Sequence, residues 1–489
     1  MSVIVKGSGG KSSGLYVWKK YEIIPNPYLS FLGNEDFTLK TYNTTKNWDG
    51  TLEYSTDKST WNTWDGTEIS SAGSKLYLRG TGNTKITGNS NKFRFVFTGT
   101  DALKIACEGN IENLLDYTTV SAGGHPTMAN DCYRYMFNGC TLLTSAPELP
   151  ATTLTYNCYA FMFGGCTSLT TAPSVLPATK LAVNCYAGMF YGCTSLTTAP
   201  ALPATTLYDE CYRDMFHDCT ALTTAIELPA TTLARECYRD MFRGCTSLTT
   251  TPELPATTLA EFCYYNMFYG CTSLTTAPSV LPATTLAGSC YYNMFYGCTS
   301  LTSAPALPAT TLTDGCYRDM FNGCTSLTTA PALPATTLAG SCYYNMFYGC
   351  TSLTTAPSVL PATTLAVNCY QSMFRNCTSL ISAPSLPATT LDKSCYNGMF
   401  RGCTSLTTTP ELPATTLTDG CYRDMFNGCT NIKLSTAQTG EYQTAYRIPK
   451  SGTGTTATNA LNGMFTNTGG TFTGTPTINT TYYTSNTVV

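Results

Sequence analysis

The sequence predicts an α/β solenoid: an array of about twelve units of 26 or 27 residues, each with a short parallel strand and a two-turn helix, preceded by a small all-β sandwich domain. The main observation is cysteine spacing. Twenty-four of the 25 cysteines form twelve Cys-x7-Cys pairs, from Cys132/Cys140 to Cys421/Cys429, and successive pairs begin 26 or 27 residues apart. Such a period is the signature of stacked repeats, and it accommodates a chain of 489 residues without one large compact core.

Four regions flank the array, which spans residues 132–430. Residues 1–30 are glycine-rich and then aromatic, and we expect them to be an attachment segment. Residues 31–106 alternate apolar and polar side chains between turn residues, which predicts the sandwich. Residues 107–131 are expected to cap the first of the repeats at 132–430. Residues 431–489 are expected to hold an insertion with a hairpin around Thr439-Gly440, followed by a degenerate capping repeat.

The two-turn helix is predicted from the spacing inside each cysteine pair. In the unit that begins at Cys316, the cysteines, Tyr317, Met320 and Phe321 would share one side of a helix. The residue before the first cysteine is usually Ser, Asn, Asp or Gly, which suits a helix N-cap. The residue before the second cysteine is Gly in ten of the twelve units, which suits a left-handed helix C-cap. The Ala-Pro-x-Leu-Pro run that follows limits the strand to a very short one.

The cysteines are predicted to be reduced, buried core residues. Residues eight apart on a helix lie about 12 Å apart, beyond the roughly 7 Å that a disulfide can span between Cα atoms. No Cys-x2-Cys pair of the kind that holds zinc occurs in the array. We therefore expect no disulfide, no metal site and no cofactor.

Charge and motif content exclude several functions. Only 12% of the residues are charged and the net charge is -3, so no nucleic-acid partner is expected. The first residues lack the apolar stretch of a secretion signal, so none is expected there, and no stretch is apolar enough for us to expect membrane insertion. The two histidines, His125 and His217, form no triad. The four aspartates that follow an arginine are interpreted as solvated surface rather than as a catalytic pair, so no enzyme is predicted: Asp214, Asp240, Asp319 and Asp424.

The repeat consensus M-F-x-G-C-x-x-L, followed by Leu-Pro and a further Leu, resembles the BspA-type leucine-rich repeats. The resemblance covers residues 132–429. This unit is a few residues longer than the family's pattern and carries Ala-Pro where the family has strand isoleucines. The segment CYYNMFYGCTSLTTAP, which begins at Cys263 and again at Cys342, is similar to segments of repeat arrays from gut bacteria and their phages. In those organisms, such proteins are surface adhesins or virion attachment proteins.

The resemblance implies a non-catalytic binding protein, and three roles are compatible with the sequence. The first is a phage attachment or receptor-binding protein on the virion, contacting a host cell-surface glycan or protein and joined to other virion proteins through residues 1–30. The second is a secreted adhesin on a bacterial cell surface. The third is a structural virion spacer. Each role allows a homo-oligomer.

The predicted binding surface is a stripe on the helix face. The three outward positions of the twelve units contain neither Lys nor Glu, although ordinary surfaces are rich in both, and they favour Tyr, Arg and Asn, as recognition surfaces do. The alternative is that these side chains only cover neighbouring repeats. The stripe comprises Tyr265, Asn266, Tyr269, Tyr292, Asn293, Tyr296, Arg318, Asn322, Tyr344, Asn345 and Tyr348. Separately, Trp48, Trp61 and Trp64 near turns could stack on sugar rings or else pack in the core.

Overall fold

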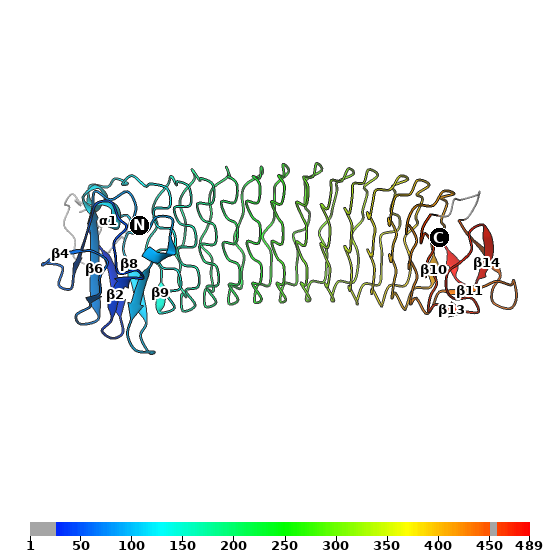
Figure 1. Ribbon diagram of the computed structural model, residues 1–489, viewed down its shortest axis with the longest axis horizontal. Coiled ribbons are helices and arrows are strands. Elements are labelled where there is room, and N and C mark those ends of the chain that lie inside the picture. The colour runs from blue at the N-terminus through cyan, green and yellow to red at the C-terminus, as the bar shows by residue number, and fades with distance from the viewer. Residues whose placement is uncertain (1–25, 450–456) are drawn as a thin grey trace, which may run out of the picture.

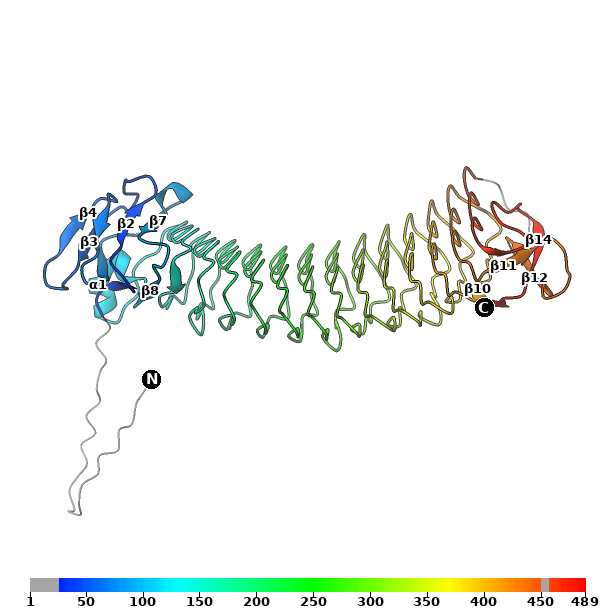
Figure 2. The ribbon, with the colours of Figure 1, turned by 90° about the horizontal axis from the view of Figure 1, so that it is seen from below.

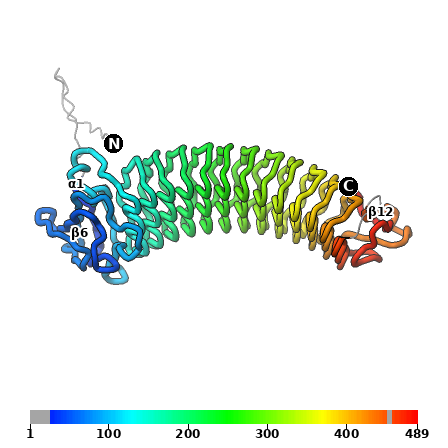
Figure 3. Tube along the Cα trace, turned by 45° about the horizontal axis from the view of Figure 1, so that its top comes forward, coloured from blue at the N-terminus to red at the C-terminus, as the bar shows by residue number. Residues whose placement is uncertain are grey.

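The computed structural model describes residues 26–449 and 457–489. The chain is a long, gently curved solenoid with a small β-rich part at its N-terminal end and a second small sheet at its C-terminal end (Figures 1 and 2). The stacked coils follow one another at regular intervals along the whole arc (Figure 3). Most of the predicted attachment segment, residues 1–25, lies outside the described residues.

Two sheets build the N-terminal part. Nine strands contribute: β1 (Leu29–Gly33), β2 (Thr38–Thr41), β3 (Thr51–Ser55), β4 (Asn62–Trp64), β5 (Ile69–Ser70), β6 (Lys75–Thr81), β7 (Phe95–Thr98), β8 (Ile105–Glu108) and β9 (Leu143–Ser145). One sheet has the order β4-β3-β6-β1-β8-β9 and the other has the order β5-β2-β7. Phe31 on β1 packs against Phe97 on β7, with ring centroids 5.1 Å apart, so the two sheets share one core. A short 3-10 helix, Asn91–Phe93, precedes β7.

The first sheet continues directly into the solenoid. Strand β8 pairs in parallel with β9, which belongs to the first repeat. The N–H of Phe95 donates to the carbonyl of Met136 at 2.7 Å, and helix α1 (Asn113–Ser121) buries Leu114 and Leu115 beside the sheet. The N-terminal part therefore covers the open end of the repeat stack, as a solenoid requires.

The predicted two-turn helices were wrong. Residues 131–428 are all described, and they contain no helix. Each segment from the residue before the first cysteine to the residue before the second, which we call a turn segment, is a run of consecutive turns. In the segment that begins at Gly315, φ is positive at every fourth residue: 59° at Gly315, 54° at Asp319 and 74° at Gly323. A left-handed residue at that frequency cannot continue an α-helix.

Alternate amides of the turn segment bond sideways instead. The N–H groups of Tyr317, Asp319 and Phe321 donate to carbonyls of the next repeat at 2.8 to 3.0 Å, while the intervening amides close the turns within the segment. The residues predicted as helix N-caps occupy the first left-handed position, and the glycines predicted to be left-handed do have positive φ. Every backbone group of the segment thus finds a partner without a helix.

Identical side chains stack in ladders beneath the turn segments. Phe321 lies between Phe295 and Phe347, with ring centroids 5.6 Å and 5.5 Å away and planes almost parallel. The Sγ of Cys324 donates to the carbonyl of Phe295 at 3.1 Å. All 25 cysteines are buried with free thiols, and burial raises the pKa of the Cys316 thiol to about 12. The core is therefore one continuous apolar column along the solenoid axis.

The strand side is as short as predicted. Most strands are reduced to single parallel bridges between threonines of successive repeats, such as Thr224 with Thr250 and Thr250 with Thr276. A second line of bridges joins Thr285, Thr311 and Thr337. One of the few full strands of the array is β10 (Thr408–Thr409), near its C-terminal end.

The C-terminal end is covered by a last turn segment and a small sheet. Phe465 stacks on Phe426 at 5.4 Å, and Met464 accepts a lateral bond from the amide of Phe426. Four strands, β11 (Lys433–Ser435), β12 (Thr444–Ile448), β13 (Gly469–Gly470) and β14 (Thr480–Thr484), have the order β12-β14-β11-β13. The hairpin predicted around Gly440 was wrong, because β14 lies between β11 and β12. Strand β15 (Thr487–Val488) pairs in parallel with β10.

Candidate functional site

The predicted stripe lies on the outer surface of the turn segments, at the second, third and sixth residues after the first cysteine of each repeat. We call this surface the turn face. The sequence predicted exposed helical positions, whereas Tyr265, Tyr292 and Tyr344 are half-buried and Asn266 and Asn322 are only 6% and 9% exposed. The reason is that side chains at one position of successive repeats cover one another.

Side chains at the second position form a continuous stack, which we call the first column. The guanidinium carbon of Arg239 lies 5.0 Å from the ring centre of Tyr265, and the Tyr265 and Tyr292 rings stack at 4.9 Å. Arg318 then lies between two rings, 5.3 Å from Tyr292 and 4.5 Å from Tyr344. Five consecutive repeats therefore contribute two planar cations and three rings to one stack.

A second column runs beside it at the sixth position. Arg243 lies 4.8 Å from the Tyr269 ring, and Tyr269 and Tyr296 stack at 4.7 Å with their planes 4° apart. Arg375 lies 5.5 Å from the ring of Tyr348. Burial raises the pKa values of the Tyr292 and Tyr296 phenols, so both remain uncharged hydrogen-bond donors at neutral pH.

The asparagines of the stripe have a largely structural role. Asn266, Asn293 and Asn345 occupy left-handed positions, with φ of 52° to 54°, which asparagine tolerates better than most residues. The amide of Asn266 donates to Asp240 of the preceding repeat at 2.9 Å, and Asn322 donates to Asp319 at 2.9 Å. These hydrogen bonds connect Asn266 and Asn322 to the buried aspartates beneath the stripe.

The interpretation of the recurring aspartates as solvated was wrong for two of them. Asp240 and Asp319 are 5% and 7% exposed. Asp240 pairs with Arg239 at 3.2 Å and with Arg243 at 3.3 Å, while Asp319 pairs with Arg318 at 3.4 Å. The carboxylates therefore hold Arg239, Arg243 and Arg318 in place. Sequence reasoning missed this role because it assigned the aspartates to an outward helix face.

Two of the three tryptophans predicted as candidates for sugar stacking lie in the core. Trp48 and Trp64 are 4% and 1% exposed, and their rings stack on each other at 5.1 Å. Core packing, the alternative interpretation, describes both. Trp61 is half-buried, with the guanidinium of Arg79 covering its ring at 4.0 Å.

Within the described residues, no group of three or more His, Cys, Asp or Glu side chains could hold a metal ion, and no helix there is long and apolar enough to cross a membrane. Near-identical coils with stacked apolar ladders, closed at both ends, define a leucine-rich-repeat scaffold. The BspA type leucine rich repeat region model matches in six copies, over residues 130–275, 210–354, 260–381 and 288–433. The chain belongs to this family.

Two solved structures are similar. A leucine-rich repeat protein from Bacteroides ovatus has 20% sequence identity and a TM-score of 0.37, covering 69% of this chain and 91% of its own. A leucine rich cell surface protein from Faecalibacterium prausnitzii has 21% identity and a TM-score of 0.35, covering 63% of this chain and 82% of its own. No curated protein gave a significant match.

Proposed function

We propose that the chain is a non-catalytic surface-binding protein whose turn face, between Arg239 and Arg375, contacts a glycan or protein on a cell surface. The observation that carries the proposal is the pair of columns. They concentrate tyrosine and arginine on one surface of a scaffold whose strand side is nearly uniform in Thr, Ala and Pro. Tyrosine and arginine dominate the energetics of recognition surfaces.

The rigidity of the columns supports the same conclusion. Four of the six column rings stack on another ring, and the other two lie against an arginine. Each column arginine named above lies against a ring, a carboxylate or both. Lateral backbone bonds fix the segments that carry them. Binding therefore costs little side-chain ordering, since the conformations already exist before the ligand arrives. Their half-burial leaves ring edges, hydroxyls and guanidinium groups accessible at a regular spacing, as a repetitive glycan or an extended protein surface requires.

Membership of a family that includes surface adhesins supports an extracellular or cell-surface location. The role as a phage attachment protein stays a prediction. Immunogold labelling of purified phage particles tests it, and the absence of label from the particles would contradict it.

The test of the binding surface is a sextuple tyrosine-to-serine variant compared with a matched control. The variant changes the column tyrosines Tyr265, Tyr269, Tyr292, Tyr296, Tyr344 and Tyr348. The control changes Tyr156 and Tyr208, which are 44% and 46% exposed and lie outside the columns. Labelled full-length proteins are incubated with a panel of gut bacteria and epithelial cells. We expect the sextuple variant to lose binding to the cells that the parent protein recognises, while the control retains it.

Thermal melting and hydrogen exchange of the turn segments establish that the sextuple variant is folded. If the folded sextuple variant binds those cells as well as the parent protein does, the turn face is not the binding surface.

A further inference from the structure

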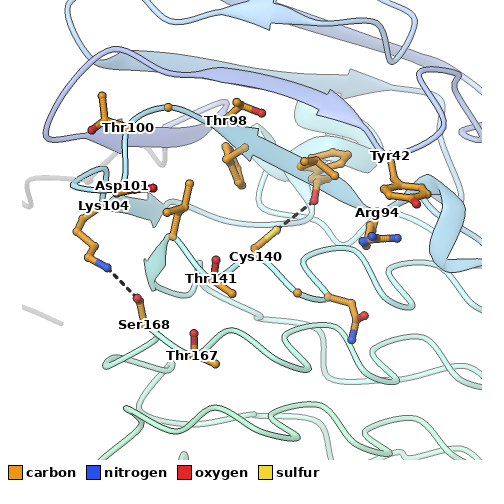
Figure 4. Close-up of a pocket in the computed structure, with 17 residues that line it drawn as sticks. Tyr42, Arg94, Thr98, Thr100, Asp101, Lys104, Cys140, Thr141, Thr167 and Ser168 are labelled. Atoms are coloured by element: carbon orange, nitrogen blue, oxygen red, sulfur yellow. Dashed lines mark hydrogen bonds between the residues drawn. The ribbon is translucent and has the colours of Figure 1, made fainter.

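A groove of about 610 Å³ lies where the N-terminal part meets the first repeats (Figure 4). Strand β7 and the loop after it form one wall, and the turns around Cys140 and Thr167 form the other. The groove lies apart from the columns of the turn face, whose first member belongs to the fifth repeat. None of its residues takes part in the proposed cell-surface contact.

A fixed aromatic ring stands at one end of the groove. Tyr42 is 57% exposed, the largest value among the exposed large hydrophobic side chains of the described residues. The guanidinium carbon of Arg94 lies 3.9 Å from its ring centre, and the backbone N–H of Tyr42 donates to the carbonyl of Arg94 at 2.9 Å. The ring is thus held on one side and open to solvent elsewhere. An exposed, immobilised ring is a platform for the apolar face of a sugar.

The two basic side chains of the groove have no acidic partner. In the part of the chain that the structure describes, neither Arg94 nor Lys104 forms an ion pair, unlike the column arginines Arg239 and Arg318. The Nη1 of Arg94 donates to the carbonyl of Asn91 at 3.0 Å, and the Nζ of Lys104 donates to Ser168 at 2.9 Å. The exposed carboxylate of Asp101 lies toward the Lys104 end (Figure 4). Net positive charge therefore remains at the Arg94 end, beside the ring.

The groove lies at the end of the lateral hydrogen bonding between successive turn segments, which we call the turn ladder. In each later repeat, the carbonyl of the sixth residue after the first cysteine accepts an amide from the preceding repeat, as Gly164 does from Gly139 at 2.7 Å. Asn138 holds this position in the first repeat, and no described residue donates to its carbonyl. That carbonyl, together with the hydroxyls of Thr98 and Thr141, leaves acceptors for a ligand's hydroxyl groups.

We infer that this groove binds a carboxylate-bearing oligosaccharide. One sugar ring packs on Tyr42, its carboxylate pairs with the guanidinium of Arg94, and hydroxyls of the following rings donate to the Asn138 carbonyl. Arginine suits the carboxylate because its planar fork forms two parallel bonds to the two oxygens. A long peptide strand fits less well, since β7 spans only Phe95–Thr98 and the amide of Phe95 is already bonded to Met136.

The test is calorimetric titration of the full chain with hexagalacturonate, an acidic sugar chain, and with maltohexaose, a neutral one. Hexagalacturonate should bind, with an affinity that falls as sodium chloride is raised, and maltohexaose should bind at least about tenfold more weakly. The Arg94→Gln and Tyr42→Ser variants should each weaken hexagalacturonate binding by about tenfold. The matched controls, Lys92→Gln at an exposed cation outside the groove and Tyr208→Ser, should leave it unchanged.

Three results would overturn the inference: no binding of hexagalacturonate, equal binding of maltohexaose, or unchanged affinity in folded Arg94→Gln and Tyr42→Ser proteins. Unchanged melting temperatures establish that these variants are folded. The sextuple tyrosine variant of the turn face should bind hexagalacturonate normally, so failure of the groove and failure of the proposed cell-surface contact are distinguishable.

Discussion

Replacing Gly398 by alanine distinguishes the turn ladder from the helix that the sequence suggested, because the two structures predict opposite changes in stability. Gly398 has a φ of 61°, and an added Cβ would meet only Ser372 Oγ at 3.3 Å and Arg401 Cβ at 3.9 Å. The effect is therefore mainly conformational. A left-handed alanine costs about 1 to 2 kcal/mol, and the lower entropy of the unfolded alanine chain offsets about 0.4 to 1 kcal/mol of this. We expect a net loss of about 1 kcal/mol, whereas in a helix the same change would stabilise by about 0.5 to 1 kcal/mol.

Native-state hydrogen exchange of the amides in residues 395–403 measures this change locally, because the Gly398 amide bonds to the Arg423 carbonyl at 2.8 Å. The matched control is Ser372→Gly at the equivalent position of the preceding repeat, where φ is 53°. It should change the opening free energy of its own segment in the opposite direction. Slower exchange in Gly398→Ala would refute the turn ladder.

Three further predictions concern the core and the ends. The 25 thiols should not react with Ellman's reagent in the folded protein, because burial raises their pKa values, to about 12 for Cys271, and all should react in denaturant; a titre near zero there would reveal disulfides. Burial raises the pKa of the Glu112 carboxyl above its ordinary 4.5, so the folded state holds that proton more tightly and the free energy of unfolding should fall as pH rises above 4.5. The Glu112→Gln variant should flatten this dependence, as measured by thermal melts from pH 4 to 7. An unaltered profile in the variant would contradict the prediction. Deleting the repeat at 316–341 should shorten the solenoid and keep it folded, whereas deleting residues 433–489 should expose the last repeat and cause aggregation, which light scattering measures.

The sequence predicted the repeat period, the buried cysteines' positions in the repeat and the short strands because each depends on spacing alone. It did not predict the turn ladder. The relevant signal was present, since Asp319, Asn345 and Asp424 stand four residues after the first left-handed position and are residue types that tolerate a second one. Apolar residues three and four apart fit either structure, so periodicity could not decide between them.

The stripe was likewise predicted only in part, because its residues could be selected from the sequence but their contacts could not. Its tyrosines and arginines could be selected from their recurrence at fixed positions of the repeat, and the structure does bring them together. That Arg318 would lie between Tyr292 and Tyr344, or that Asp240 would be buried beneath the columns, depends on lateral stacking between repeats. The groove at Tyr42 joins residues from two parts of the chain that no repeat relates, and the sequence offered no sign of it.

We propose above that the columns of the turn face contact the cell surface. Hydroxyl-radical footprinting of the full chain bound to the cells it recognises, read out by mass spectrometry for each tyrosine, tests this claim directly. We expect oxidation of Tyr265, Tyr292 and Tyr344 to fall on binding while oxidation of Tyr156 and Tyr208 is unchanged. Unaltered oxidation of the column tyrosines in the bound protein would contradict it.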